Sequence, residues 1–203
     1  MSFSRLLLVG ANSKKCIKGI RNDKVCVSSK IFIAGRDAYE GEVVLCFQLD
    51  EISDPGKRVA HCLGMPAQIK RCDGLVFYSQ DDNTDRVICL VEMKNTNITD
   101  AAKQIKSTKK HIEDLLRKEC DSLPDEYRSE CSKQIARIIW KASLYHSSSS
   151  PGKVEDFQRE LKADGFIDIG NLTSADNDLR PLLSGEGRSA KEMAKKIRKS
   201  RNR

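Results

Sequence analysis

The 203-residue sequence contains no apolar run long enough to cross a lipid bilayer. The apolar run nearest the N-terminus, Leu6-Leu7-Leu8-Val9, is also shorter than the hydrophobic region of a secretory signal peptide. We therefore expect a protein without a membrane partner, located in the cytoplasm.

Motifs for a structural zinc site are also missing. The chain has 8 cysteines, yet none of them forms a C-x-x-C pair, and it has only 3 histidines. Cys46, Cys72 and Cys89 lie inside apolar runs, where a free thiol behaves as a small hydrophobic side chain. We therefore predict buried, reduced cysteines, and neither a zinc site nor a disulfide framework.

An excess of positive charge is absent from most of the chain. Residues 188–203 contain eight lysines and arginines and one acid, so this segment carries the whole net charge of +7. The overall composition, 39% hydrophobic and 32% charged, is typical of a globular protein with polar extensions. We predict one domain at residues 1–187 and a basic C-terminal tail at residues 188–203. Such a tail either contacts the phosphates of a nucleic acid or is a solvated end that favours solubility.

The pattern of apolar residues predicts an α/β domain with a mixed central sheet flanked by helices. Residues 42–52 suit either a strand or a buried helix, and residues 121–131 form a polar segment without a predicted element. One helix is expected from Thr99 or Asp100 to about residue 120, and a second at residues 153–165. Strands are expected in residues 25–35 (one or two), at 58–63, 69–79 and 86–94, in the middle of 133–146, and as a short edge strand at 166–169.

Acidic and basic residues interrupt two of these apolar strands. Glu92 and Lys94 end the run that begins at residue 86, and residues two apart in a strand project to the same face. Asp73 interrupts the strand at 69–79 in the same way. If Phe77 lies opposite Ile88 across the polar loop at 80–85, then Asp73 lies opposite Glu92, with Cβ atoms about 5 Å apart.

Two carboxylates at this distance repel each other, and both stay ionised only if a cation lies between them. Asp73 and Glu92 are therefore candidate metal ligands, and hard oxygen ligands of this kind suit Mg²⁺, with Mn²⁺ as a substitute. Lys94, on the same face as Glu92, would position or deprotonate an attacking water, or neutralise charge on a phosphate. These residue types suit the metal-dependent hydrolysis of phosphodiester bonds.

The stretch from Asp73 to Glu92-Met93-Lys94 resembles the PD-(D/E)XK nuclease superfamily. The resemblance covers roughly residues 59–145 and implies a restriction-endonuclease-like core, composed of a helix, three antiparallel strands, a helix and a further strand. It implies that Asp73 and Glu92 bind the metal, that Lys94 is catalytic, and that Gln104 corresponds to a glutamine that some branches place after the lysine. Cys72 stands where the classical motif has proline. The resemblance also implies an acid on the first helix, for which Glu40, Glu42 and Glu51 are all candidates.

The resemblance implies a Mg²⁺-dependent nuclease that acts on DNA in preference to RNA. With one site per chain, cutting both strands of a duplex would take a homodimer or two successive nicks, and an accessory protein partner remains open. Two alternatives stay open on the same fold: a catalytically inactive nucleic-acid-binding module and a protein-interaction module. A second Glu-x-Lys copy, Glu160-Leu161-Lys162, lies in a helical pattern, where residues two apart point in different directions.

Overall fold

The computed structural model describes residues 24–26, 31–34, 42–49, 65, 68–80, 86–94, 98–147 and 151–185. A five-stranded mixed sheet forms its centre, so the predicted α/β class is confirmed. The strand order is β3-β4-β5-β6-β7; β3, β4 and β5 are antiparallel to one another, and β5, β6 and β7 run parallel. The strands span Glu42–Gln48 (β3), Gly74–Gln80 (β4), Arg86–Lys94 (β5), Ile138–His146 (β6) and Asp168–Leu172 (β7).

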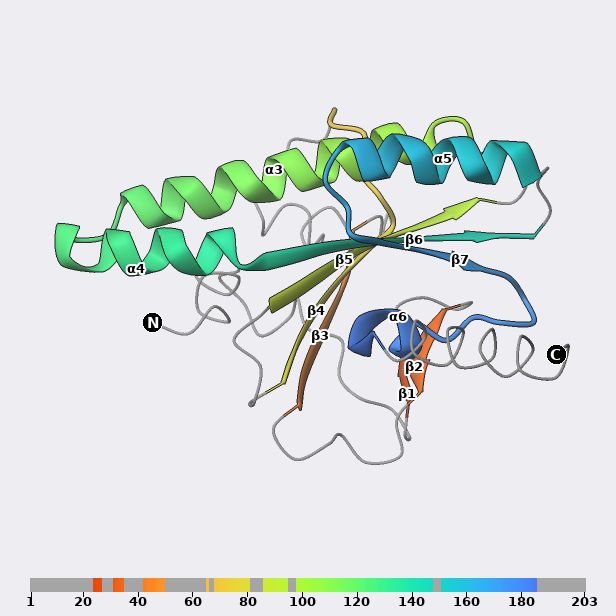
Figure 1. Cartoon of the computed structure of the whole chain (residues 1–203), viewed down its shortest axis with the longest axis horizontal. Helices are drawn as coiled ribbons and strands as arrows, with labels where there is room; N and C mark the ends of the chain where they lie inside the picture. The colour runs from red at the N-terminus through yellow and green to blue at the C-terminus, as the bar shows by residue number, and fades with distance from the viewer. Residues whose placement is uncertain are drawn as a thin grey trace, which may run out of the picture.

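The helices lie on both sides of this sheet. Two of them, α3 (Ala101–Asp121) and α5 (Pro151–Ala163), are on one side, and α4 (Asp125–Ala136) lies next to α3, in line with β6 (Figure 1). The short helix α6 (Arg180–Ser184) is on the other side, together with a separate antiparallel pair of strands, β1 (Lys24–Cys26) and β2 (Phe32–Ala34). No helix in these stretches combines the length and the apolar character that a membrane span needs.

Both faces of β5 are buried, which explains why its sequence is a continuous apolar run. Ile88 and Leu90 belong to the core beneath α3 and α5. Val87, Cys89 and Val91 belong to the core on the opposite face. A strand in contact with helices or loops on both sides has no solvated face for polar residues. The polar side chains of β5 are therefore confined to its two ends.

The predicted helix after β5 is confirmed, with small differences at its ends. The buried positions of α3 recur every three or four residues, and the helix packs this face against β5. Asp100 occupies the N-cap position, although its side chain makes no capping hydrogen bond. The five cysteines whose side chains are described are buried thiols, as predicted: Cys46, Cys72, Cys89, Cys120 and Cys131.

Two of the predicted strands, those at residues 69–79 and 166–169, begin later in the structure than the sequence predicted. The predicted strand at residues 69–79 begins only at Gly74, because side chains of α3 bind the backbone before it (see below). The antiparallel neighbour of β4 is β3, one of the two alternatives for residues 42–52. The strand predicted at 58–63 lies outside the described residues. The edge strand predicted at 166–169 is β7, shifted to 168–172, and it pairs with β6.

The prediction of a polar segment without regular structure at 121–131 was wrong, because α4 occupies much of it. Cys131 is the only buried residue of this helix, so the sequence has no apolar stripe to indicate it. Local signals replace the stripe: Pro124 stands at the N-cap position, and Asp125 and Glu126 in the first turn complement the positive end of the helix dipole.

Candidate active site

The pairing of β4 with β5 confirms the register expected from the sequence. Phe77 pairs with Ile88, and the last pair toward the site is Gly74 with Val91. Asp73 directly precedes Gly74, and Glu92 directly follows Val91, so the two acids occupy the next positions beyond the last pair. Asp73 itself is not part of the strand, in contrast to the prediction.

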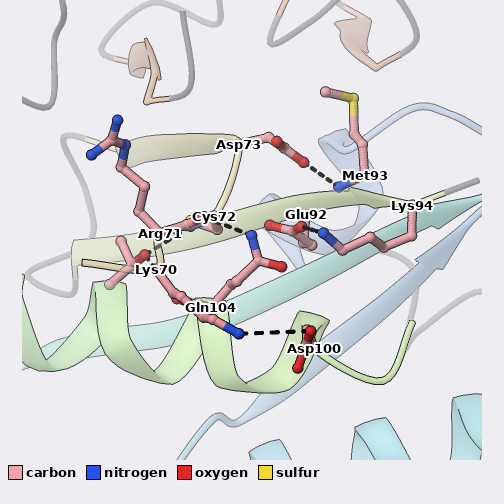
Figure 2. Close-up of polar contacts among 10 residues, drawn as sticks. Lys70, Arg71, Cys72, Asp73, Glu92, Met93, Lys94, Asp100 and Gln104 are labelled. Carbon is pink, nitrogen blue, oxygen red and sulfur yellow. Dashed lines mark hydrogen bonds and ion pairs between the residues drawn. The ribbon is translucent and has the colours of Figure 1, made fainter. Parts of the chain in front are cut away.

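The Asp73 carboxylate is held by the backbone of β5. Its Oδ2 atom accepts a hydrogen bond from the Met93 amide at 2.5 Å (Figure 2). Met93 separates Glu92 from Lys94 in the chain, so Asp73 is anchored directly between the two other residues of the predicted site. Charged hydrogen bonds of this kind fix the orientation of a carboxylate more firmly than contact with water does.

Glu92 is fully buried, and its pKa is raised from 4.5 to about 7. Burial is the main cause, because it disfavours the charged form, and the negative charge of Asp73 adds to it. Lys94 and a hydrogen bond with the Asp73 backbone act in the opposite direction and favour the charged form. The positions of the two acids beside the last strand pair, together with the hydrogen bond from Met93 to Asp73, place Asp73 next to the end of β5 that carries Glu92.

Lys94 and Glu92 form an ion pair on the same face of β5, with Lys94 Nζ 2.6 Å from Glu92 Oε1 (Figure 2). The Lys94 side chain keeps 25% of its surface exposed, whereas that of Glu92 keeps none. The Asp73 backbone also favours the charged form of Glu92 through a hydrogen bond, yet burial outweighs these contacts. The carboxylate therefore depends on charge compensation, from Lys94 or from a bound cation.

A cavity of about 350 Å³ lies beside Lys94. Among the described residues, Lys70, Asp100 and Gln104 also line it. Lys70 and Lys103 both lie 3.7 Å from Asp100, in ion pairs that are largely exposed to solvent. The cavity thus joins the end of β5 to the start of α3, and the described part of its lining carries two lysines and one acid.

Gln104 contributes to the site through the backbone. Its Nε2 atom donates a hydrogen bond to the Arg71 carbonyl at 3.0 Å, two residues before Asp73 (Figure 2). Gln104 also lines the cavity with Lys94. The structure therefore brings all four predicted residues to one place, and Gln104 supports the chain that presents Asp73.

The donor set fits a hard divalent cation. Mg²⁺ takes one or two protein carboxylates and completes its shell with water and substrate oxygens, which Asp73 and Glu92 allow. The described residues contain no group of three or more His, Cys, Asp or Glu side chains that could hold a metal ion, either at this site or elsewhere. Burial raises the pKa of the neighbouring Cys72 thiol, so this thiol stays protonated and does not compete as a ligand.

The three candidates for a further acid have different outcomes. The backbone of Glu42 pairs with Gln80, at the opposite end of β4 from Asp73. A strand of this length spans about 20 Å, so Glu42 does not join the site. Glu40 and Glu51 lie outside the described residues.

The second Glu-x-Lys copy is helical as predicted, and Glu160 in α5 pairs with Lys106 of α3.

Sequence reasoning missed two buried polar residues near the site. Thr108, on α3, accepts a hydrogen bond from the Cys72 amide at 2.9 Å. His146 pairs in register with Lys94, and its Nε2 atom lies 2.6 Å from Asn171 Oδ1. The position of His146 at the end of an apolar strand is the same signal that identified Glu92. Thr108 had no such signal, because it follows the helical period of the apolar residues around it.

Comparisons with models of protein families, with curated proteins and with solved structures found no match to this chain.

Proposed function

We propose that this chain is a metal-dependent nuclease that hydrolyses phosphodiester bonds in DNA, with Mg²⁺ as its cofactor. The carrying observation is the buried Glu92 carboxylate, which has Lys94 on its own face and Asp73 at the adjacent position of the hairpin. A restriction-endonuclease-like core is part of the proposal. Three antiparallel strands, the helix α3 and, after the additional helix α4, the further strand β6 occur in the order that the resemblance implies, which supports it.

Asp73 and Glu92 would hold the metal ion. When bound, Mg²⁺ supplies a Lewis acid for the phosphate and favours ionisation of a coordinated water. The protein's part is to keep two carboxylates close together at the end of a rigid strand. The Met93 amide keeps the Asp73 carboxylate in place, and the burial of Glu92 excludes water that would otherwise screen its charge.

Lys94 is the residue that would act on the phosphate. Its ammonium group contacts Glu92 and lines the cavity, so a phosphate in the cavity would meet a positive charge beside the metal ligands. A fixed ammonium at this position stabilises the negative charge that develops on the phosphate during hydrolysis, or orients the attacking water. Lys70, on the same cavity, would add a second positive charge for the strand.

Contacts with the nucleic acid would involve only some of the lysines of α3. Lys106 pairs with Glu160, and Lys109 is buried against the rings of Trp140 and Phe166. Lys103 and Lys110 remain exposed on the helix. The basic tail at 188–203 lies outside the described residues, and its eight basic side chains are the proposed contact with phosphates beyond the site.

A catalytically inactive module is the second candidate, and the Glu92–Lys94 ion pair favours it, because Lys94 already compensates the charge of Glu92. A plain protein-interaction module is less well supported. It requires no convergence of the acids, yet the Asp73 carboxylate is bound to the Met93 amide, between Glu92 and Lys94.

Cleavage assays separate these candidates. Plasmid, linear duplex, single-stranded DNA and RNA are incubated with the full chain in Mg²⁺, Mn²⁺ or EDTA. We expect metal-dependent cleavage of DNA that is lost in Asp73→Asn, Glu92→Gln and Lys94→Met. Lys162→Ala, in the helical Glu-x-Lys copy, is the matched control and should cleave like wild type. Cleavage in EDTA, or cleavage that survives these site substitutions, would contradict the proposal. Metal-dependent binding without cleavage would favour the inactive module.

A further inference from the structure

Two side chains of α3 bind the two ends of a single peptide group beside the site. Gln104 Nε2 donates to the carbonyl of Arg71, at 3.0 Å. Thr108 Oγ1 accepts from the amide of Cys72, at 2.9 Å. This carbonyl and this amide belong to the same peptide bond. Gln104 and Thr108 are four residues apart, so they are neighbours on one face of the helix.

The Thr108 hydroxyl is fully engaged in this arrangement. It accepts the Cys72 amide and donates its own proton to the Gln104 carbonyl at 2.9 Å. Donating to the carbonyl four residues back is a common use of a threonine hydroxyl within a helix. Thr108 is completely buried, so water does not replace either contact. The side chain therefore links α3 to the segment before β4 with a defined orientation.

The bound peptide group joins Arg71 and Cys72, the two residues before Asp73. A peptide plane rotates through the dihedral angles on either side of it, and hydrogen bonds at both its carbonyl and its amide prevent that rotation. On its far side this segment is tied to the chain after β3: Leu49 donates to the Asp73 carbonyl at 2.8 Å, and Arg71 Nε donates to the Leu49 carbonyl at 3.0 Å. Residues 71–73 are thus held from two directions although they belong to no strand.

We propose that Thr108 is a positioning residue which, together with Gln104, fixes the Arg71–Cys72 peptide so that the Asp73 carboxylate reaches the Met93 amide beside Glu92. The consequence for metal binding rests on the proposed function; the positioning of Asp73 does not. A buried threonine at this point does what a valine of nearly the same shape cannot do, because only the hydroxyl accepts the Cys72 amide.

The experiment compares Thr108→Val, which removes the hydroxyl, with Thr108→Ser, which keeps it. The first readout is hydrogen exchange of the Met93 amide in the full chain without metal, with the Ile88 amide in the centre of β5 as the reference for global opening. In Thr108→Val we expect Met93 to exchange about tenfold faster relative to Ile88, the factor that corresponds to one charge-assisted hydrogen bond. Thr108→Ser should exchange like wild type.

The second readout is the affinity for Mn²⁺ without nucleic acid, measured from the electron paramagnetic resonance signal of the free ion. Residues that orient metal ligands typically contribute 10–100-fold to affinity, and we expect about this loss in Thr108→Val and recovery in Thr108→Ser. If Thr108→Val does not fold, Gln104→Met removes the other hydrogen bond of the same peptide and should give the same two changes.

The outcomes separate this inference from the proposed function. Equal exchange of Met93 in wild type and Thr108→Val overturns the inference, and so do equal defects in Thr108→Val and Thr108→Ser, or a change at Ile88 as large as that at Met93. Wild type that cleaves no nucleic acid, combined with hydroxyl-dependent protection of Met93, overturns the nuclease and supports the positioning role. If wild type cleaves nucleic acid and Met93 protection is unchanged in Thr108→Val, the nuclease proposal is supported and the positioning role of Thr108 is overturned.

Discussion

The Asp73 carboxylate accepts a hydrogen bond from the amide of Met93, the residue that separates Glu92 from Lys94. The strand that carries two of the predicted site residues therefore also anchors the third. As a result, the charge of Asp73 and its hydrogen bond are separable functions. Asparagine retains an acceptor oxygen for the Met93 amide, whereas it lacks the negative charge that acts on Glu92.

Asp73→Asn should therefore lower the pKa of Glu92 while the fold stays intact. The charge of Asp73 is the second cause of the raised value of about 7, after burial, so its removal leaves burial opposed by Lys94 and by the backbone of residue 73. We expect a titration midpoint for the Glu92 carboxyl that lies below 7 and above 4.5, measured by carbon NMR without metal. A midpoint unchanged from wild type would show that the two carboxylates do not interact.

Glu92→Gln should make the metal-free protein more stable at pH 8. The pKa of Glu92 is higher in the folded chain than in the unfolded chain, so the folded state holds more protons between pH 4.5 and about 7. The stabilisation from protonated Glu92 is complete below pH 4.5 and is lost as the pH rises through 7, by up to about 3 kcal/mol. Glutamine, which does not ionise, should remove this pH dependence.

Urea denaturation in EDTA at pH 5 and pH 8 measures this effect. The difference in unfolding free energy between the two pH values should be smaller in Glu92→Gln than in wild type. Lys94 retains access to solvent after the substitution, so the loss of its partner costs little. A variant that is less stable than wild type at pH 8 would instead show that the ion pair stabilises the fold.

Deletion of residues 188–203 should weaken DNA binding and reduce its dependence on salt. The eight basic residues of this tail release counterions when they bind phosphates, and each contact adds to the slope of affinity against salt concentration. Binding to a labelled duplex is measured by fluorescence anisotropy over a series of salt concentrations. Equal affinity and equal slope in the truncated protein would mean that the tail is only a solvated end.

His146 and Asn171 should be energetically coupled. Their side chains form a hydrogen bond at 2.6 Å, and His146 is buried next to Lys94 in the strand register. A double-mutant cycle with His146→Leu and Asn171→Leu, measured by urea denaturation, should give a coupling energy of about 1 kcal/mol. Additive effects of the two substitutions would show that this hydrogen bond contributes no net stability.

The central part of the fold could be predicted because its residues follow simple periods. The run from Val87 to Val91 is apolar without interruption, and its length and turn signals predict a buried strand. The register with β4 followed from matching the charged residues Asp73 and Glu92, and the structure confirms it. Polar residues at the end of a buried strand are costly, which is why they indicated the site.

Other features depended on contacts between distant segments. The prediction placed Asp73 inside a strand because its neighbours are apolar, yet its backbone partners come from α3 and from Leu49. The hydrogen bonds that Thr108 and Gln104 form with the Arg71–Cys72 peptide could not be predicted from the periodic pattern of α3. The helix α4 was missed for the opposite reason, because it is stabilised by its ends and has almost no buried face.

The candidate site is encoded almost entirely in one continuous piece of chain. Asp73, Glu92, Lys94, Gln104 and Thr108 all lie between residues 68 and 108, in a hairpin followed by a helix. Such short-range contacts form quickly during folding, whereas β6 must return from a distance to pair with β5. Leu144 of β6 pairs with Glu92, so the burial that raises the pKa of Glu92 is complete only when this late contact forms. During synthesis, the chain would therefore acquire the geometry of the site before its electrostatics.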